Sequence, residues 1–288
     1  MSSLTMPRRR FVVGSALLLA SCVLGRSREI IRQIEEDLGG RVGASILDTH
    51  SLQRVTHRST ERFAMCSTFK APLVAAVLAR IDAGSISSSA MLRLPREPLL
   101  STSPIANAHL GAGQIPVMTA CEAAVSHSDN TAANLLLDLI GGPTAMTQFF
   151  RTLGDDTARL DRYEMELNSN IAGDVRDTTT PDAMVHSIQA ILLGNALTAT
   201  SRDLLTDWML HEQRGKARIR AGMPADWRVA NKPGTSANGA TNDIAVVWPS
   251  RRVPIVMAIY VDAPSESNAG REKAIARIAR LAAEDFSA

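Results

Sequence analysis

Apolar side chains recur at strand spacing near both ends of the chain and at helical spacing in the long segment between them. The strand-like runs cover residues 42–47, 52–56, 227–236, 243–248 and 253–261. A helical stripe over residues 26–38 precedes the first run, and a closing helix that includes Ile275 follows the last one. We therefore expect one sheet that is built from the two chain ends.

The segment between these two groups of strands is mostly helical. Apolar residues at helical spacing cover residues 68–81, 120–126, 131–140, 143–153, 181–192 and 201–211. We predict an α/β (α+β) fold with flanking helices and an inserted all-helical lobe, as one domain over residues 23–288. Its α/β lobe is expected at residues 23–64 and 212–288, and its helical lobe at residues 65–211. A cleft between two lobes is a common place for a binding site.

Composition excludes several classes of function. The chain has 288 residues, a formal net charge of +2 and no repeats or low-complexity tracts. Its basic residues are scattered along the sequence, which argues against nucleic-acid binding. The six histidines show no metal-ligand spacing, so we expect neither a metal nor another cofactor. We expect a monomer that acts on a small molecule.

Residues 1–22 are predicted to be a signal peptide. Residues 8–10 are three arginines, and the apolar run after them is shorter than the roughly 20 residues that span a bilayer. Arg-Arg-x-Phe-Val resembles the twin-arginine signature, although a Sec signal with extra arginines would look similar. Leu19-Ala-Ser-Cys22 resembles a lipobox for lipidation of Cys22, unless that cysteine only lies near a cleavage site. We expect export to the periplasm by either route, with membrane contact only through the signal or a lipid on Cys22.

Two further cysteines, Cys66 and Cys121, remain after this segment. An oxidising compartment permits a disulfide, but only between Cα atoms within about 7 Å, which the sequence does not determine. We expect two free thiols, with Cys121 buried and Cys66 beside the functional site.

A serine and a lysine share one face at the start of the helix predicted over residues 68–81. Ser67 and Lys70 are three positions apart, so we expect the hydroxyl and the amine within hydrogen-bond reach. A serine becomes a nucleophile when a neighbouring base takes its proton, and a desolvated lysine can have its pKa lowered enough to do so. Alone, the pattern Ser-x-x-Lys also fits a capped, solvated helix start.

Two more motifs make this signal specific. Ser128-Asp129-Asn130 would by itself be a helix cap, and Lys232-Pro-Gly would by itself be a turn. In this order, Ser-x-x-Lys, Ser-Asp-Asn and Lys-x-Gly resemble the signature of the penicillin-recognising serine enzymes, and the chain is similar to the class A β-lactamases. The similar segments are residues 65–70, 126–137, 162–168, 176–181 and 241–248. The resemblance implies an antiparallel five-stranded sheet of the β-lactamase/transpeptidase type and hydrolysis of penicillins and cephalosporins through an acyl-enzyme on Ser67.

The resemblance also implies roles for the other motif residues. Ser128 would pass a proton to the leaving ring nitrogen, and Asn130 would hold the acylamide side chain of the substrate. Lys232 would support Ser128 and attract the substrate carboxylate. The backbone N–H groups of Ser67 and Thr235 would form the oxyanion hole.

Residues 162–168 resemble the Ω-loop motif Glu-x-x-Leu-Asn, which implies a deacylating carboxylate. The spacing to Leu-Asn selects Glu164 and not Glu166. Glu164 would be the general base for the hydrolytic water, and Asn168 would hold that water. Whether Lys70 or Glu164 takes the proton during acylation stays open. The resemblance further implies that Arg162 and Asp177 pair across the loop neck.

The sequence departs from the family at several site positions. Pro233 replaces the usual Thr or Ser hydroxyl, but its missing N–H should face the open cleft, so we expect the strand to persist. The family's usual arginine is absent at Thr241, and we expect Arg218 to take its place in supporting the carboxylate unless it is a solvated surface residue. Three residues are similar to those of carbapenem-hydrolysing members of the family: Cys66, Thr235 and Arg218. The usual cysteine partner of Cys66 is Ser236 here, however, so carbapenem hydrolysis does not follow.

Two alternatives share these motifs. A D-Ala-D-Ala carboxypeptidase or transpeptidase would acylate in the same way and hydrolyse slowly, but Glu164 and Asn168 argue against it. A non-catalytic lipoprotein could keep the fold with Pro233 as a sign of decay, although all the acid–base residues are present.

Overall fold

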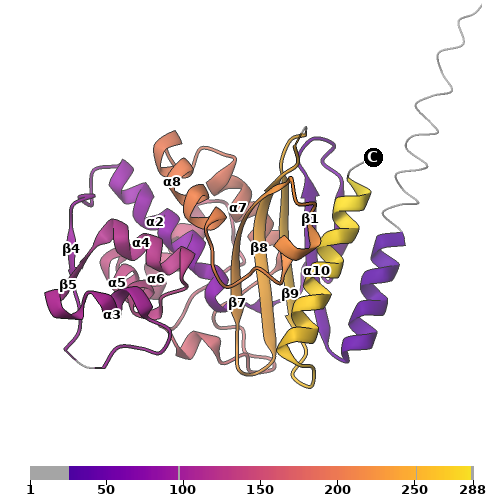
Figure 1. Ribbon diagram of the computed structural model, residues 1–288, viewed down its shortest axis with the longest axis horizontal. Helices are drawn as coiled ribbons and strands as arrows, with labels where there is room; N and C mark the ends of the chain where they lie inside the picture. Colours follow the sequence, from indigo (N-terminus) through magenta and orange to yellow (C-terminus); the bar gives the residue numbers. More distant parts are fainter. Residues whose placement is uncertain (1–25, 97, 251, 287–288) are drawn as a thin grey trace, which may run out of the picture.

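The computed structural model describes residues 26–96, 98–250 and 252–286, so the predicted signal peptide and Cys22 lie outside the described residues. A five-stranded antiparallel sheet with the order β2-β1-β9-β8-β7 forms the centre of the fold (Figure 1). Its strands are β1 (Arg41–Asp48), β2 (Arg54–His57), β7 (Arg228–Thr235), β8 (Ala240–Trp248) and β9 (Ile255–Asp262). Because β1 pairs with β9 along its whole length, the sheet joins both chain ends, as predicted.

The central strand β9 is apolar and buried on both faces, which is why its sequence is a continuous hydrophobic run. Alternate side chains enter two different cores. Ile259 packs with the helix over residues 26–38 and with α10 (Asn268–Asp285) on one face. Tyr260 enters the larger core that the helices of the other face provide. The sheet is thus the middle layer of the molecule.

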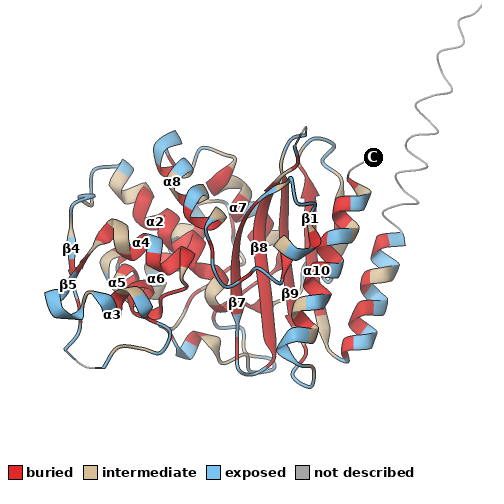
Figure 2. Ribbon diagram, viewed as in Figure 1, coloured by how far each residue is buried: buried red, intermediate tan, exposed pale blue. Residues whose placement is uncertain are grey.

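The helical part surrounds α2, whose residues from Lys70 to Leu78 are all buried (Figure 2). The main helices are α2 (Lys70–Asp82), α4 (Val117–Ser126), α5 (Asn130–Ile140), α6 (Gly142–Thr152), α7 (Pro181–Leu192) and α8 (Ala199–Leu210). α7 has the predicted bounds, and the Thr180 hydroxyl caps it by accepting from Ala183 N. α7 also packs against β1 and β9, which connects the helical part to the sheet.

Short elements that the periodicity did not predict close the fold. They are β3 (Phe63–Ala64), η1 (Cys66–Phe69), β4 (Met91–Arg93), α3 (Pro104–Ala108), η2 (Leu110–Ala112), β5 (Gln114–Pro116), η3 (Glu166–Asn168), β6 (Thr178–Thr179) and α9 (Ile219–Gly222). β3 pairs with β6 and β4 with β5, each as a two-stranded antiparallel sheet. Among the described residues, every helix is too short or too polar to cross a membrane.

Candidate active site

An open cavity of about 590 Å³ lies where β7, η1 and the Ω-loop (residues 161–178) meet. Its lining includes six of the predicted site residues: Ser67, Ser128, Asn130, Asn168, Arg218 and Thr235. Lys70, Glu164 and Lys232 do not line the cavity, since their side chains are buried beneath it. Hydrogen bonds join all three to the lining residues, so the structure brings the predicted groups together.

The Lys70 ammonium is held by three other residues of the site. Its ammonium lies 2.9 Å from Glu164 Oε1 and donates to Asn130 Oδ1 over 2.6 Å and to the Ser128 carbonyl over 2.9 Å. The predicted direct hydrogen bond between Ser67 and Lys70 is wrong for this structure. Ser67 Oγ instead donates to Glu164 Oε1 over 3.4 Å. The chain is still a 3-10 helix at Ser67, and the Lys70 side chain turns toward these stronger acceptors.

The Ser128 hydroxyl lies between two ammonium groups. Lys70 Nζ donates to Ser128 Oγ over 3.4 Å, and Lys232 Nζ donates to the same oxygen over 3.1 Å. Both lysines are fully buried, and this burial lowers the pKa of the Lys70 amine and lowers the pKa of Lys232 to about 7. Carboxylates oppose the two shifts, Glu164 at Lys70 and Glu212 at Lys232. The Lys232 amine can therefore give or take a proton near neutral pH.

Glu164 is buried, whereas Glu166 is exposed, in agreement with the spacing argument that selected Glu164. Asn134 fixes the Glu164 backbone, because its amide donates to the Glu164 carbonyl and accepts from the Glu164 N–H, both over 2.9 Å. Asn168 Nδ2 donates to Glu164 Oε2 over 2.6 Å. Sequence reasoning missed Asn134, although its position four residues after Asn130 on α5 was the available signal.

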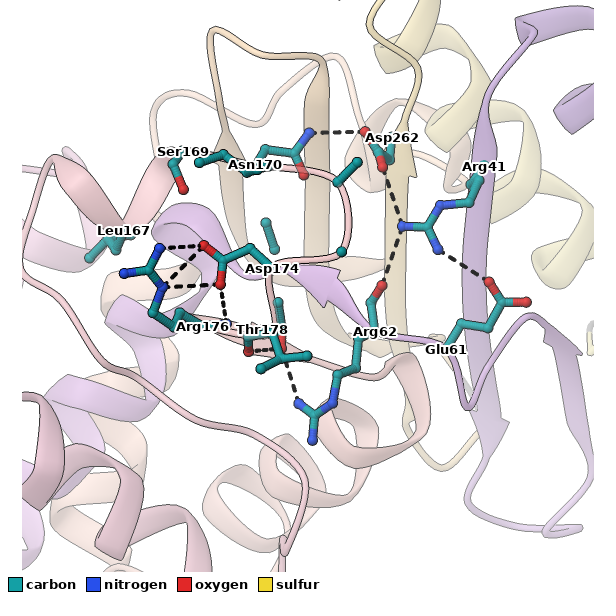
Figure 3. A pocket seen from close by; sticks show the side chains of 15 residues that line it. Arg41, Glu61, Arg62, Leu167, Ser169, Asn170, Asp174, Arg176, Thr178 and Asp262 are labelled. Carbon is teal, nitrogen blue, oxygen red and sulfur yellow. Dashed lines mark hydrogen bonds and ion pairs between the residues drawn. The ribbon is translucent and has the colours of Figure 1, made fainter.

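The predicted pair of Arg162 and Asp177 is confirmed at the neck of the Ω-loop. Arg162 Nε donates to Asp177 Oδ2 over 2.6 Å, and the Arg162 N–H donates to the other carboxylate oxygen over 2.9 Å. Asp177 is fully buried. The wide part of the loop is also held, since Asn170 donates to Asp262 on β9 over 2.9 Å (Figure 3). The loop that carries Glu164 is thus fixed at its neck and at its tip.

Two residues beside the reactive groups have left-handed backbone conformations. Cys66, directly before Ser67, has a φ of 47°, and Ser128 has a φ of 56°. Such conformations are strained for residues with a Cβ and are often found at functional sites. A third strained position, Asp177 with a φ of 57°, lies at the loop neck. The backbone is therefore constrained where it presents the two serine hydroxyls.

Strand β7 continues through Pro233, as predicted. Pro233 lies opposite Asp243 of β8, and the strand runs unbroken to Thr235. β7 is an edge strand, so a residue without an N–H is tolerated on its open side. The Pro233 carbonyl accepts a hydrogen bond from Lys232 Nζ over 3.0 Å.

Arg218 is buried and is not a solvated surface arginine. Its guanidinium donates to Thr235 Oγ1 over 2.7 Å, to the Gly234 carbonyl over 2.8 Å and to Glu272 over 3.1 Å. Thr241, where the family usually has an arginine, instead accepts a hydrogen bond from Arg271 over 2.8 Å. The structure thus places the Arg218 charge directly behind the Thr235 hydroxyl at the cavity wall.

Cys66 and Cys121 are both free, and Cys121 is buried, as predicted; Cys66 is buried as well. Burial raises the pKa of each thiol, so both are unreactive at neutral pH. Ser236, at the position of the absent cysteine partner, donates from Oγ to the Asn168 carbonyl over 2.5 Å. This bond joins the end of β7 to the Ω-loop. Across the described ranges of the chain, no group of three or more His, Cys, Asp or Glu side chains could hold a metal ion.

Comparison with known proteins gives consistent matches over nearly all of the described chain. The Beta-lactamase enzyme family matches residues 26–286. The carbapenem-hydrolyzing β-lactamase KPC of Klebsiella oxytoca is 46% identical over 257 residues, which cover 89% of this chain and 87% of that protein. β-Lactamase AER-1 of Aeromonas hydrophila is 42% identical over 250 residues, 87% of this chain and 82% of its own. The solved structure of an ancestral (GNCA) class A β-lactamase has a TM-score of 0.88 at 47% identity and covers 90% of this chain and 100% of its own.

Proposed function

The chain belongs to the β-lactamase enzyme family, as a class A serine β-lactamase, and from that premise we propose which of its residues carry out the reaction. The activity is hydrolysis of the β-lactam amide, which confers resistance to β-lactam antibiotics. In our proposal Ser67 forms an acyl-enzyme, and a water activated by Glu164 then releases the product. The observation that carries this proposal is the Glu164 carboxylate within 3.4 Å of Ser67 Oγ, buried and held on a fixed loop.

During acylation, Ser67 Oγ attacks the β-lactam carbonyl carbon while its proton passes to Glu164. The hydrogen bond between these two groups supports this route, and Lys70 at 2.9 Å holds the carboxylate in place. The carbonyl oxygen becomes an oxyanion that the N–H groups of Ser67 and Thr235 stabilise. As the C–N bond breaks, the ring nitrogen takes the proton of Ser128 Oγ. An ammonium proton from Lys70 then replaces it, since Lys70, like Lys232, donates to Ser128 Oγ. The neutral Lys70 amine takes the proton that Glu164 holds 2.9 Å away, so Glu164 is ionised again before deacylation.

Deacylation needs a water between Glu164 and the ester carbon. Asn168 Oδ1 supports a water site there, because this atom is buried and has no hydrogen-bond partner among the described residues. A water that donates to Asn168 Oδ1 can also donate to Glu164, whose Oε2 accepts from Asn168 Nδ2. Glu164 would take a proton from this water as the water oxygen attacks the ester carbon. It would then pass that proton to Ser67 Oγ, 3.4 Å away, as the ester C–O bond breaks.

Substrate recognition is assigned to the polar groups around the cavity. Asn130, whose Oδ1 is held by Lys70, would bind the acylamide side chain. Lys232 and the Thr235 hydroxyl would bind the substrate carboxylate, with Arg218 donating to that hydroxyl. Penicillins and cephalosporins carry both of these groups. The free thiol of Cys66 distinguishes this site from one with a disulfide at that position.

Replacing the two central residues separates the two halves of the reaction. Ser67→Ala should abolish acylation and lower kcat/KM for a chromogenic cephalosporin by at least about 10³-fold. Glu164→Ala should lower kcat by about 10²–10⁴-fold and accumulate an acyl-enzyme visible by mass spectrometry of the intact protein. Glu166→Ala is the matched control, since that carboxylate is exposed two residues away. Rapid steady turnover by the Glu164→Ala variant would contradict the assignment.

A D-Ala-D-Ala carboxypeptidase is the second candidate function, because such an enzyme would use the same acylation residues. The buried Glu164 and the unpartnered Asn168 Oδ1 favour the hydrolase. Assays of the purified protein with D-Ala-D-Ala peptides should therefore give little or no release of D-alanine under conditions of rapid β-lactam turnover.

We also infer that the protein is exported and acts in the periplasm as a monomer without a nucleic-acid or metal partner. The family match begins at residue 26, directly after the segment with the features of an export signal and lipobox. Radiolabelled palmitate should label the wild-type protein in cells and fail to label a Cys22→Ser variant.

A further inference from the structure

One arginine at the cavity has no role in the mechanism above. Arg214 lines the cavity and is exposed, and no atom of its guanidinium has a hydrogen-bond or ion-pair partner among the described residues. Its neighbours in sequence behave differently. Arg218 is buried against Glu272, and Arg220 donates to Asn231 and to backbone carbonyls. Arg214 is thus a free cation at the rim of a cavity that binds anionic substrates.

The backbone that carries Arg214 is fixed, although the side chain is free. Glu212, a buried carboxylate, accepts from the Arg214 N–H over 2.8 Å and from the Gly215 N–H over 2.6 Å. Gly215 lies so close to β7 that a methyl group on it would be 3.2 Å from Pro233 Cγ. These contacts hold the backbone of residues 214–215 directly beside position 233. The point from which the Arg214 side chain extends is therefore fixed.

Position 233 is where this cavity lacks a polar group. Proline has neither a hydroxyl nor an N–H, so the wall between Lys232 and Thr235 offers no donor at this residue. A substrate carboxylate bound near Lys232 would therefore have one oxygen without a hydrogen-bond donor from residue 233. The Arg214 backbone, next to Gly215, lies beside this gap, and its guanidinium carries five N–H donors. Its charge also reaches the site, since it contributes to the lowered pKa of the buried Lys70 amine.

We propose that Arg214 is a specificity-determining residue that binds the carboxylate of the β-lactam substrate, at the place where Pro233 offers no hydrogen bond. The inference rests on the proposed function, because it adds a residue to the same carboxylate subsite. In the bound state the guanidinium donates to the carboxylate oxygen that faces Pro233, while Lys232 and the Thr235 hydroxyl hold the other oxygen.

The test compares a β-lactam with its methyl ester, which has the same ring and no negative charge. Arg214→Ala should lower kcat/KM for the free acid about tenfold, as expected for a lost hydrogen bond to a charged group, and should leave kcat/KM for the ester within about twofold. Arg214→Lys should recover part of the loss, since the charge returns without the planar fork. Lys216→Ala is the matched control, because Lys216 is an exposed cation on the same segment that does not line the cavity.

A second measurement removes turnover from the comparison. In a Ser67→Ala background, which cannot be acylated, Arg214→Ala should weaken equilibrium binding of the intact free acid about tenfold. In a Pro233→Thr background the same change should weaken binding less, by about threefold, because the new hydroxyl takes over one of the contacts. Equal losses in both backgrounds would mean that Arg214 does not act at position 233.

The proposal is overturned if Arg214→Ala leaves the ratio of acid to ester turnover unchanged. An equal loss for acid and ester, with a lowered thermal midpoint, would assign Arg214 a structural role and overturn it as well. Failure of the underlying function is a separate result, because then the wild type and Lys216→Ala would also fail to hydrolyse the free acid.

Discussion

Two buried ammonium groups, those of Lys70 and Lys232, surround the Ser128 hydroxyl at distances of 3.4 and 3.1 Å. Removing a charge from water is costly, so each amine needs close acceptors or a readiness to lose its proton. Lys70 has a carboxylate at 2.9 Å, whereas the oxygens that accept from Lys232 belong to neutral groups, the Ser128 hydroxyl and the Pro233 carbonyl. Lys232 is therefore the amine whose charge depends more strongly on pH.

This difference predicts an alkaline limit to the activity. Burial lowers the pKa of Lys232 to about 7 in the free enzyme, so the ammonium is present below that pH and is lost as the pH rises through it. We expect kcat/KM for carboxylate-bearing β-lactams to fall above about pH 7, because the free enzyme then loses an attractive charge. Profiles of kcat/KM against pH, measured for a β-lactam and its methyl ester, check this expectation.

Lys232→Arg is the control for this fall in kcat/KM at alkaline pH, since arginine stays protonated throughout the range. The alkaline fall for the free acid should move to higher pH in this variant, whatever its overall activity. Lys216→Arg, on the exposed surface, should leave the profile unchanged. If kcat/KM for the free acid falls at the same pH in Lys232→Arg as in the wild type, the titrating group is not Lys232.

Among the elements, β7 is positioned by a glycine contact with the segment that precedes α2. A methyl group on Gly234 would lie 2.8 Å from the Met65 carbonyl oxygen and 3.0 Å from Ser67 N, both of them backbone atoms. Neither atom can move alone, because η1 continues directly into α2. β7 can thus lie this close to Ser67 only because residue 234 has no side chain. The spacing of the two proposed oxyanion donors depends on the same close approach.

Gly234→Ala should therefore reduce catalysis more than stability. Moving β7 away from Ser67 widens the proposed oxyanion hole, and losing one such donor lowers kcat by about 10²–10³-fold. Steady-state kinetics with a chromogenic cephalosporin, together with thermal unfolding, measure the two effects. Gly111→Ala is a matched control, because that glycine is exposed and has no atom within 4 Å of the added methyl group. Near-normal kcat in Gly234→Ala would show that the strand has room to adjust.

Sequence periodicity predicted the long elements and missed those that depend on distant partners. α7 was predicted with its bounds, since twelve residues give more than three turns of pattern and a proline marks the start. β3 and β6 have two residues each, which is too short for an alternation, and they pair across more than 100 positions. The pair β4 and β5 was missed because each strand is also too short for an alternation, although the two lie closer in sequence.

At the site, motif spacing located the groups but not their hydrogen bonds. The positions of Ser67 and Lys70 predicted that the two side chains point together, yet the actual acceptors of Lys70 come from α5 and the Ω-loop. Asn134 is a second example, because its role is to hydrogen-bond the backbone of Glu164, which is thirty positions away. Contacts of this kind follow from the assembled fold and not from local spacing.

For the molecule as a whole, the sheet is closed by segments from opposite ends of the chain. The helix over residues 26–38 and α10 cover the same face, and their apolar side chains form one core with β1 and β9. This helix also makes a buried polar contact with the sheet. Glu35, a buried carboxylate in this helix, makes that contact with the start of β1 and the end of β2.

Glu35 therefore couples acid stability to the closure of the sheet. Burial opposes its ionisation, but hydrogen bonds from Arg58, from the Val42 N–H and from His57 outweigh this effect and lower its pKa from 4.5 to about 2. A carboxyl with a lowered pKa in the folded state contributes stability that is present above about pH 4.5 and is lost as the pH falls to about 2. Glu35→Gln should lower the free energy of unfolding at pH 7 by about 1–3 kcal/mol, since it weakens hydrogen bonds to a charged group.

The pH dependence distinguishes this role from simple loss of packing. Between about pH 4.5 and pH 2 the free energy of unfolding should fall more steeply for the wild type than for Glu35→Gln, so the difference between the two proteins shrinks with acid. Urea unfolding at several pH values measures that difference. Glu36→Gln is the matched control, because Glu36 is exposed and pairs only with Arg32 on the same helix among the described residues. A difference that stays constant with pH would mean that the charge of Glu35 does not hold the first helix against the sheet.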